Sequence, residues 1–471
     1  MKAELSFLVN NDTVSGKFDP AMVLLDFLRS EKHLTGTKEG CREGDCGACT
    51  VLIGTLRNGQ VVYQSANSCL MPLANVHNKH VVTIEGLTSS DMTPVQHAFV
   101  HEGATQCGFC TPGFIVSLTG YLLHAQYADI EDAKDSIAGN ICRCTGHAAI
   151  IRAAQTVVTG LEELSSVTDR VGYLIRNNYL PEYFGLIPER IRLLEEKLPV
   201  SDTDKLHSFI GGGTDLFVQK PDDLLDSDNV YLNNADINFI RCEENRCIVG
   251  AGVTFQRFAE SDIIRDQIPE IKNFMRLVAS LPIRNSATIG GNIVNASPIG
   301  DLSILLLALQ ADVTLAKKDQ KRKFPLHELY QGYKTLAKDS DEYIRSVSFE
   351  YLSADHKVNF EKVSKRTHLD IATVNSAICI ANIDDLILEA RVSAGGVAPY
   401  PLLLVNTSAY LLNKHLNQET INEAAKIAQE EISPISDIRG SAEYKRVLLD
   451  RLIRAHFITL FPQYISFEDL V

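Results

Sequence analysis

Residues 41–50 read C-R-E-G-D-C-G-A-C-T, and a fourth cysteine follows at position 69. Three thiols this close in the chain can converge on one centre only if the backbone between them curls tightly. Gly40, Gly44 and Gly47 stand around these cysteines, where a Cβ atom would obstruct a loop that takes positive φ angles and points its N–H groups inward. The stretch therefore predicts a glycine-rich loop that holds a metal centre with cysteine sulfurs.

The spacing of the four cysteines indicates which kind of centre. The order C-x4-C-x2-C followed by one distant cysteine matches the plant-type 2Fe-2S loop, with Cys41, Cys46, Cys49 and Cys69 as ligands. A zinc knuckle and a disulfide pair are the alternatives. Zinc sites usually group their cysteines as two C-x2-4-C units, whereas the fourth cysteine here is single and distant. The spacing and the glycines together favour the iron-sulfur interpretation.

Length and charge limit what else the chain can do. At 471 residues it is expected to fold as about three domains, because one hydrophobic core rarely grows beyond about 250–300 residues. The net charge of −14 argues against a nucleic-acid surface and gives no basic patch for a membrane. The N-terminus lacks the apolar run of a signal peptide and no apolar run elsewhere is long enough to span a bilayer, so a cytoplasmic location is expected.

The chain contains eleven cysteines, which without an export signal are better explained as metal ligands than as disulfides. Eight of them precede residue 145, and these are the candidate ligands. The other three, Cys242, Cys247 and Cys379, are expected to be ordinary buried or surface thiols.

Residues 1–84 are predicted to form a small β-rich domain around the first cysteine loop. Residues 5–9 and 51–53 have strand character, and residues 60–64 follow the turn signal Asn58-Gly59. Between them, residues 22–34 place apolar side chains on one face of a predicted helix. A helix laid across a small sheet beside the cysteine loop is a ferredoxin-like β-grasp arrangement.

Residues 85–155 are predicted to form a helical domain with a second set of cysteines. Thr93-Pro94 opens one helix, which runs to residue 101, and Thr111-Pro112 opens another. The motif Q-C-G-F-C-T-P-G supplies Cys107 and Cys110, and G-N-I-C-R-C-T-G-H supplies Cys142 and Cys144. Two such pairs at helix ends can converge on one centre, and helix N-termini favour an anionic cluster. A four-cysteine zinc site is the alternative that the spacing alone allows.

The region after this domain is predicted to begin with a linker over residues 156–178, which contains a short polar stretch. Residues 209–216, F-I-G-G-G-T-D-L, then predict a strand that runs into three glycines. A Rossmann fingerprint would need a glycine where Leu216 stands. The turn can still cradle a pyrophosphate with its N–H groups, and a simple tight turn is the alternative.

Residues 281–301 are predicted to form a long loop, because small and hydrogen-bonding residues dominate there. Exposed amides and hydroxyls of this kind suit a large polar ligand such as a dinucleotide. Lys362 and residues 364–372 add cations and a carboxylate near a predicted strand, although a charged run is usually a solvated surface. The tail is predicted to contain a strand and two helices, at residues 386–393, 424–432 and 444–456.

In their order along the chain, these motifs resemble those of the molybdenum hydroxylases. The quoted cysteine and glycine motifs carry the resemblance, together with T-I-G-G-N-I-V-N-A-S-P-I-G-D and S-P-I-S-D-I-R-G-S-A-E-Y, at residues 288–301 and 433–444. Within the family, the chain looks most like the small, iron-sulfur and FAD-binding subunit of two-subunit bacterial xanthine dehydrogenases. The resemblance implies an α+β multidomain fold. It would combine a β-grasp 2Fe-2S domain, a helical-bundle 2Fe-2S domain, a vanillyl-alcohol-oxidase-type FAD-binding domain over 179–385 and an α/β C-terminal subdomain over 386–471.

The resemblance also implies ligands for each cofactor. Cys41, Cys46, Cys49 and Cys69 would hold the cluster nearer the flavin, and Cys107, Cys110, Cys142 and Cys144 the one nearer molybdenum. Asp370 falls in a loop that carries one carboxylate where animal members have a denser acidic run, and Gln106 would reach the molybdopterin of a partner. The implied FAD-binding residues are Ser208, Phe209, Ile210, Gly211, Gly212, Gly213, Thr214, Asp215, Thr288, Ile289, Gly290, Gly291, Asn292, Asp301, Ile344, Lys362 and Asp370.

The function implied by the resemblance is electron transfer. Electrons from hypoxanthine or xanthine, oxidised at molybdopterin on a partner chain, would pass through two 2Fe-2S clusters to FAD and then to NAD. No side chain of this chain would act as a catalytic acid, base or nucleophile. A large molybdopterin-binding subunit is the expected partner, in an α2β2 heterotetramer. The alternatives are the equivalent subunit of an aldehyde or other N-heterocycle dehydrogenase, and a zinc-binding scaffold protein without enzyme activity.

Overall fold

The computed structural model describes residues 2–88, 91–125, 127–161, 167–194, 208–225, 227–232, 235–366 and 369–470. They form two compact units. Unit 1 comprises Met1–Tyr231 with the short segment Ser280–Ser286, and unit 2 comprises Leu232–Ala279 with Ala287–Val471. Among the helices of these described ranges, none is long and apolar enough to cross a membrane.

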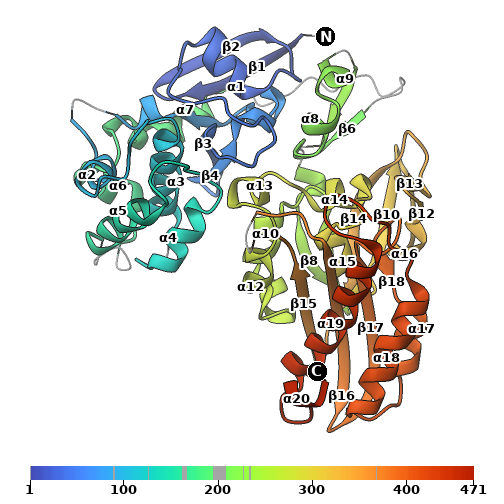
Figure 1. Ribbon diagram of the computed structural model, residues 1–471. Helices are drawn as coiled ribbons and strands as arrows, with labels where there is room; N and C mark the ends of the chain where they lie inside the picture. Colours follow the sequence, from blue (N-terminus) through green and yellow to red (C-terminus); the bar gives the residue numbers. More distant parts are fainter. Residues whose placement is uncertain are drawn as a thin grey trace. The chain divides into compact units, whose positions relative to one another are not determined.

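Unit 1 begins with a five-stranded sheet of order β2-β1-β5-β3-β4 (Figure 1). A helical segment, α1 (Leu24–Asp26) continued by η1 (Phe27–Glu31), packs on it, and the Phe27 ring lies edge-on to Phe7 with centroids 5.5 Å apart. The predicted strands, the predicted helix and the β-grasp arrangement are confirmed. The strands and short turns are β1 (Ala3–Val9), β2 (Asp12–Phe18), β3 (Thr50–Arg57), β4 (Gln60–Asn67), β5 (His80–Val82), η2 (Ser68–Leu70), η3 (Leu73–Val76) and η4 (Ile84–Gly86).

A group of helices follows the sheet, as predicted. They are α2 (Pro94–His101), α3 (Thr111–His124), α4 (Ile130–Ile137), α5 (Ala148–Thr159) and α6 (Arg170–Arg176). α2 begins where its capping signal lies, because the Thr93 hydroxyl accepts the N–H of Gln96 at 3.3 Å while the Gln96 side chain accepts the N–H of Thr93 at 2.8 Å. Both helix starts predicted from a threonine followed by proline are confirmed.

The linker predicted over residues 156–178 is wrong for its described part. α5 continues to Thr159 and α6 begins at Arg170, and the side chains of Leu161 and Leu174 are fully buried. They belong to one core that also contains sheet residues such as Leu52 and Val82. Apolar side chains that join a core hold the backbone in place, so this stretch is part of unit 1; residues 162–166 lie outside the described ranges.

The rest of unit 1 comes from the region predicted to belong to the FAD-binding domain. Ile187 and Ile191 pack in a cluster with Leu8 of β1, so residues 182–192 lie against the β-grasp sheet. The short segment Ser280–Ser286 also joins unit 1, through α13. The elements are η6 (Glu182–Leu186), α7 (Ile187–Arg192), β6 (Ser208–Ile210), α8 (Leu216–Gln219), α9 (Pro221–Leu225), β7 (Asn229–Tyr231) and α13 (Leu281–Arg284).

Unit 2 contains a five-stranded sheet of order β11-β10-β14-β9-β8, with helices before and after its strands. Its strands are β8 (Ile240–Glu243), β9 (Arg246–Gly250), β10 (Asp312–Lys317), β11 (Gln320–Pro325) and β14 (Tyr343–Glu350), and β12 (Tyr330–Gly332) pairs with β13 (Thr335–Leu336). The helices are η7 (Ala235–Ile237), α10 (Phe255–Glu260), α11 (Asp262–Gln267), α12 (Ile271–Arg276), α14 (Ile289–Asn295), α15 (Asp301–Ala308) and α16 (Leu326–Leu329).

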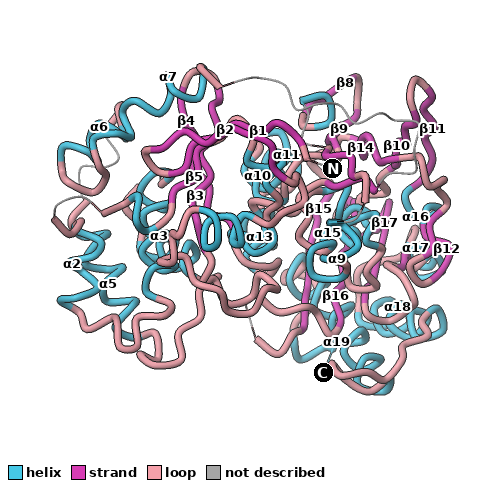
Figure 2. The backbone as a smooth tube through the Cα atoms, turned by 90° about the horizontal axis from the view of Figure 1, so that it is seen from above, coloured by secondary structure: helices cyan, strands magenta, loops and turns pink. Residues whose placement is uncertain are grey.

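The second sheet of unit 2 runs in the order β15-β16-β17-β18, and Figure 2 labels β15, β16 and β17. Ser393 of this sheet donates to the C=O of Ile304 in the buried helix α15 at 2.7 Å. The strands are β15 (His356–Val363), β16 (Val374–Ile383), β17 (Leu386–Gly395) and β18 (Leu402–Leu403), and the helices α17 (Val405–Leu411), α18 (Gln418–Glu431), α19 (Ala442–Leu460) and α20 (Phe467–Leu470) follow. The predicted strand and the two predicted tail helices are confirmed.

The predicted domain boundary at residues 385 and 386 is wrong. It falls in the turn between β16 and β17, which pair from Asn375↔Gly395 to Ile383↔Leu386. Partners in one hairpin share backbone hydrogen bonds and a core, so the C-terminal sheet begins earlier, at His356.

Residues 281–301 form helical turns rather than the predicted long loop. α13 and α14 occupy most of the stretch, and α15 starts at Asp301. Small residues serve close packing here, because a Cβ on Gly290 would lie 2.7 Å from the Cβ of Ala251. Ile289 and Ile293 are fully buried, so the stretch contributes to the core.

His456→Gln is expected to make the stability of the protein less sensitive to acid. The ring lies fully buried in α19, where it contacts Asn359 and the Ser376 hydroxyl at 3.0 Å each, and burial lowers its pKa to about 3. As the pH falls below about 6.5 the unfolded chain takes up a proton that the folded chain refuses. The free energy of unfolding then drops by about 1.4 kcal/mol per pH unit until the folded pKa is reached.

The measurement is urea unfolding of wild type and His456→Gln between pH 7.5 and pH 5. The variant should be less stable at pH 7.5, since hydrogen bonds are disturbed, yet lose less stability on acidification. The control is Ser376→Ala, which removes one hydrogen-bond partner of the ring but keeps His456, so it should be less stable than wild type and retain the wild-type pH dependence. If His456→Gln loses as much stability on acidification as wild type, His456 is not the group that makes the stability sensitive to acid.

Candidate functional sites

The first four predicted ligands lie together as two pairs of sulfurs. The Sγ atoms of Cys49 and Cys69 are 3.4 Å apart, and the Cys41 and Cys46 side chains hydrogen bond to each other. A 2Fe-2S cluster needs this arrangement, because each of its two irons takes two cysteine sulfurs. All eleven cysteines are free thiols in the structure. The disulfide alternative is therefore wrong.

A single metal ion would need a different arrangement. Within the described ranges, no group of three or more histidine, cysteine, aspartate or glutamate side chains forms a site for one metal ion. Tetrahedral zinc would need four sulfurs at similar mutual distances. The contacts of Cys49 with Cys69 and of Cys41 with Cys46 provide the two sulfur pairs that the two irons of a 2Fe-2S cluster would take.

The backbone of the first loop supplies the hydrogen bonds expected for sulfur anions. The N–H of Glu43 donates to the Sγ of Cys41 at 3.4 Å, and those of Asp45 and Cys46 contribute as well. The hydrogen bond from the Cys46 thiol and these N–H groups lower the pKa of Cys41 to about 4. Gly44 has φ +80°, which glycine tolerates best, so the glycine argument made from the sequence is confirmed there.

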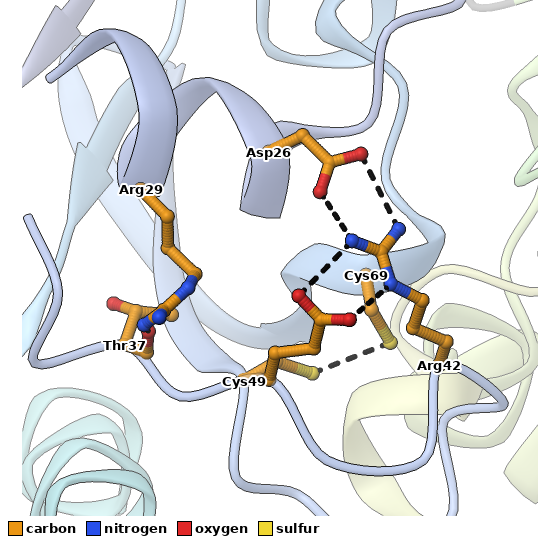
Figure 3. A network of polar contacts seen from close by, with 7 residues as sticks. Asp26, Arg29, Thr37, Arg42, Cys49 and Cys69 are labelled. Atoms are coloured by element: carbon orange, nitrogen blue, oxygen red, sulfur yellow. Dashed lines mark hydrogen bonds and ion pairs between the residues drawn. The ribbon is translucent and has the colours of Figure 1, made fainter. Parts of the chain in front are cut away.

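Arg42 fixes this loop to the helical segment that crosses the sheet (Figure 3). Its guanidinium group contacts the Asp26 carboxylate at 2.5 Å and the Glu39 carboxylate at 2.7 Å. Nearby, Arg29 donates to the C=O of Thr37 at 2.9 Å. Sequence reasoning missed these residues, because the partner Asp26 lies outside the cysteine motif; the two carboxylates close to one arginine are a signal that only the fold reveals.

The second set of ligands is also paired. The Sγ atoms of Cys107 and Cys144 are 3.6 Å apart, and the Cys110 and Cys142 thiols contact each other. Burial opposes ionisation of Cys142, but hydrogen bonds from the hydroxyl and N–H of Thr145 outweigh it and lower the pKa of this thiol. The two segments that carry these cysteines converge, as predicted.

The surroundings of the two cysteine sites differ in exposure. Cys49 and Cys69 are 2% and 4% exposed and share a buried cluster with Ile210 and Phe217. Cys107 and Cys144 are exposed, and Phe109 beside them is 46% exposed. Gln106 is exposed as well. The second site therefore opens to the surface of unit 1, whereas half of the first is enclosed.

The three-glycine turn lies beside the first cysteine site, within unit 1. β6 ends at Ile210 and Gly213 has φ +81°, so the predicted strand and turn are confirmed. The Asn75 side chain donates to the C=O of Gly211 at 3.2 Å. Ile210 and Phe217, on either side of the turn, pack in the same cluster as Cys49 and Cys69. A ligand bound along this turn would lie next to the first site.

Several predicted flavin residues of unit 2 have hydrogen-bond or ion-pair partners within that unit. Thr288 caps α14 by accepting the N–H of Gly291 at 3.1 Å, and the Asn292 side chain accepts the N–H of Ser303 at 3.1 Å. Lys362, with a 2% exposed side chain, contacts the Asp301 carboxylate at 2.8 Å. The structure thus brings two predicted positions, Lys362 and Asp301, together from distant parts of the chain.

The two other predicted positions of unit 2 have different surroundings. Asp370 pairs with Arg366 at 2.5 Å, and hydrogen bonds from Arg366 outweigh burial and lower the pKa of this carboxyl. Ile344 lies in β14 opposite Leu315 and is 2% exposed, so its side chain serves the core. The three remaining cysteines fit the ordinary thiols predicted, since Cys242 is exposed while burial raises the pKa of Cys247 and Cys379 to about 12.

Four sequence families match successive parts of the chain. They are described as a 2Fe-2S iron-sulfur cluster binding domain, over residues 8–74, and a [2Fe-2S] binding domain, over 83–155. An FAD binding domain in molybdopterin dehydrogenase follows over 189–349, and a CO dehydrogenase flavoprotein C-terminal domain over 360–460. The first two contain the two sets of paired cysteines, and the third contains both glycine-rich stretches.

Individual relatives agree with these matches. Aldehyde oxidase 1 of Bos taurus is 29% identical across 100% of this chain and 40% of its own length. Xanthine dehydrogenase/oxidase of Rattus norvegicus is 28% identical across 94% of this chain and 38% of its own length. This chain therefore spans less than half of either relative.

A solved structure supports the same assignment over about half of the chain. Reconstituted CO dehydrogenase from Oligotropha carboxidovorans matches with a TM-score of 0.51 and 25% identity, over 53% of this chain and 88% of the matched chain. The order of the domains, the paired cysteines and the relatives all agree. Together these matches indicate the iron-sulfur and FAD-binding domains of a molybdenum hydroxylase.

Proposed function

We propose that this chain is the electron-transfer subunit of a molybdenum hydroxylase. When bound, two 2Fe-2S clusters and FAD would supply one-electron carriers and a flavin that can deliver electrons in pairs. The observation that carries the proposal is the packing within unit 1. The exposed pair of Cys107 and Cys144 and the enclosed pair of Cys49 and Cys69 lie in the same unit, and residues on either side of the turn at Gly211 pack against the enclosed pair.

The roles of the residues follow from this order. Cys107, Cys110, Cys142 and Cys144 would hold the cluster that receives electrons, because their site opens to the surface where another polypeptide can approach. Cys41, Cys46, Cys49 and Cys69 would hold the cluster next to the flavin. Exposed Phe109 and Ile141 give the surface around the first acceptor an apolar character suited to a protein partner.

For the flavin, we propose the positions expected from the sequence. The backbone of residues 208–215 would bind the pyrophosphate, and residues 288–292 would contribute polar contacts. Lys362 and Asp301 satisfy each other, so they would present a fixed, nearly neutral pair to the cofactor rather than a free charge. Asp370, held by Arg366, would border the site of the final electron acceptor.

The substrate and acceptor belong to the same proposal. Hypoxanthine or xanthine would be oxidised at molybdopterin on a large partner subunit in an α2β2 heterotetramer, and NAD would accept the electrons in the cytoplasm. Xanthine and aldehyde enzymes are both among the relatives, so the equivalent subunit of an aldehyde or other N-heterocycle dehydrogenase is the second candidate. The match covers 88% of the CO dehydrogenase chain, so little of that chain lies outside the part similar to ours. This supports a molybdenum-binding domain on a separate chain.

The proposal is tested by the cofactor content of the chain purified with its large partner. We expect about four irons, about four labile sulfides and about one FAD per chain, with a broad red-brown visible spectrum. Bound zinc in place of iron, or no flavin under conditions that preserve it, would contradict the electron-transfer role. Bleaching of the spectrum by xanthine, and not by aldehydes, would then select the first substrate class.

A further inference from the structure

The side chain of Asn140 is buried where the segments carrying both cysteine sites meet. It is 2% exposed and lies two residues before Cys142. Its Nδ2 group donates to the C=O of Gly47 at 2.9 Å and to the Thr50 hydroxyl at 3.2 Å. Gly47 and Thr50 belong to the loop of the first cysteine site, so one amide reaches from the second site to the first.

The other end of the same amide binds the third cysteine-bearing segment. The hydroxyl of Ser117 in α3 donates to Oδ1 of Asn140 at 2.7 Å, and α3 begins directly after Cys110. All polar atoms of the Asn140 amide thus have partners in the protein interior. A buried amide with partners on three segments fixes their mutual geometry, because moving any segment leaves a buried polar group unsatisfied.

The backbones around Asn140 approach each other without intervening side chains. A Cβ on Gly113 would lie 2.4 Å from the C=O oxygen of Gly47 and 2.9 Å from Nδ2 of Asn140. The N–H of Ile141 donates to the C=O of Cys46 at 3.0 Å. The two sites are therefore in direct backbone contact, and Asn140 is the side chain that ties this contact together.

We propose that Asn140 is a positioning residue that sets the separation and orientation of the two clusters, and with them the rate of electron transfer between the clusters. The inference rests on the proposed electron-transfer function. In the step concerned, one electron leaves the reduced cluster of the exposed site and reduces the oxidised cluster of the enclosed site. Electron tunnelling weakens steeply with separation, so a small shift of either loop should slow this step while leaving both clusters bound.

The test compares Asn140→Asp and Ser117→Ala with wild type, using the cofactor-loaded protein. Asn140→Asp keeps the shape but turns an acceptor oxygen toward the C=O of Gly47, which should push the loops apart. Ser117→Ala removes one hydrogen bond and should act in the same direction more weakly. The control is Ser136→Ala, since this buried hydroxyl donates to the C=O of Ala133 within its own helix and touches neither cysteine loop.

Three readouts separate positioning from a merely structural role. Iron content should stay at the wild-type level in Ser117→Ala and in the control. In protein reduced with dithionite, the magnetic interaction between the two clusters splits their electron paramagnetic resonance signals. This splitting should be smaller in Asn140→Asp and Ser117→Ala than in wild type. Rapid-mixing reduction should show slower electron transfer from the exposed-site cluster to the enclosed-site cluster in Asn140→Asp than in wild type, with a smaller slowing in Ser117→Ala.

The outcomes distinguish the inference from the function on which it rests. Suppose that Asn140→Asp and Ser117→Ala keep full iron content, the wild-type splitting and the wild-type rate of electron transfer. This result would overturn the positioning role of Asn140 and leave the electron-transfer function standing. If Asn140→Asp loses iron, Ser117→Ala decides, and an unaltered splitting there would also overturn it. A wild-type protein without iron and sulfide would overturn the electron-transfer function, and the inference with it.

Discussion

Replacing Cys49 with alanine is expected to lower the iron content from about four atoms per chain to about two. Cys49 would share one iron with Cys69, because the two sulfurs lie 3.4 Å apart in an enclosed site. Loss of Cys49 leaves that iron with a single protein sulfur, which cannot keep a cluster assembled. The second set of cysteines is untouched, so half of the iron and about half of the visible absorption should remain.

A matched set of variants makes this result specific. Cys144→Ala should remove the other half, because Cys144 pairs with Cys107 at 3.6 Å. The visible absorption that Cys49→Ala loses should equal the absorption that Cys144→Ala retains. The double variant should bind no iron. Cys242→Ser is the control, since Cys242 is an exposed thiol on β8 of unit 2, whereas both sets belong to unit 1. Full iron content in Cys49→Ala would refute the ligand assignment.

The cysteine sites are the part of the molecule that the sequence predicts best, because local rules determine them. The C-x4-C-x2-C spacing confines three sulfurs to one loop, and Gly44 permits the left-handed backbone that the loop needs. The start of α2 is equally local, since Thr93 and Gln96 satisfy each other within one turn. Signals of this kind lie within a few residues and can be read without the fold.

The predictions that are wrong concern segments whose structure depends on contacts between distant parts of the chain. Residues 281–301 look like a loop when glycines and asparagines are taken as solvent-exposed, yet Gly290 is small so that it can pack against Ala251. The polar stretch after residue 156 looks like a linker until Leu161 and Leu174 are placed in a core shared with the sheet. Burial by a remote partner overrides local propensity in both cases.

The same limit applies to the candidate sites. The sequence predicts which eight cysteines bind iron, but the way the sulfurs pair and the contact between the two sites come only from the fold. Asn140 belongs to a quoted motif, and its partner Gly47 belongs to another, but nothing in either motif indicates that the two touch. A hydrogen bond across so many residues is fixed by the packing of α3 against the sheet.

Gly47→Ala is expected to destabilise the first cysteine site strongly, for two separable reasons. Gly47 has φ +68°, a left-handed conformation that costs an alanine about 1–2 kcal/mol. In addition, a Cβ there would lie 2.4 Å from the C=O oxygen of Gly139 and 2.5 Å from Nδ2 of Asn140. Relief of such a clash typically costs about 1–3 kcal/mol. The temperature at which the visible cluster absorption is lost should therefore fall markedly.

Gly103→Ala provides the matched control that separates these two reasons. Gly103 has φ +64°, nearly the same backbone conformation, but a Cβ there would meet no atom within 4 Å. The control should therefore suffer the backbone cost alone and lose its clusters close to the wild-type temperature. The difference between the variants measures how tightly the first loop is held against the segment that carries Cys142. Equal destabilisation by both would mean that the loops can separate freely, and that their contact does not fix the distance between the two cysteine sites.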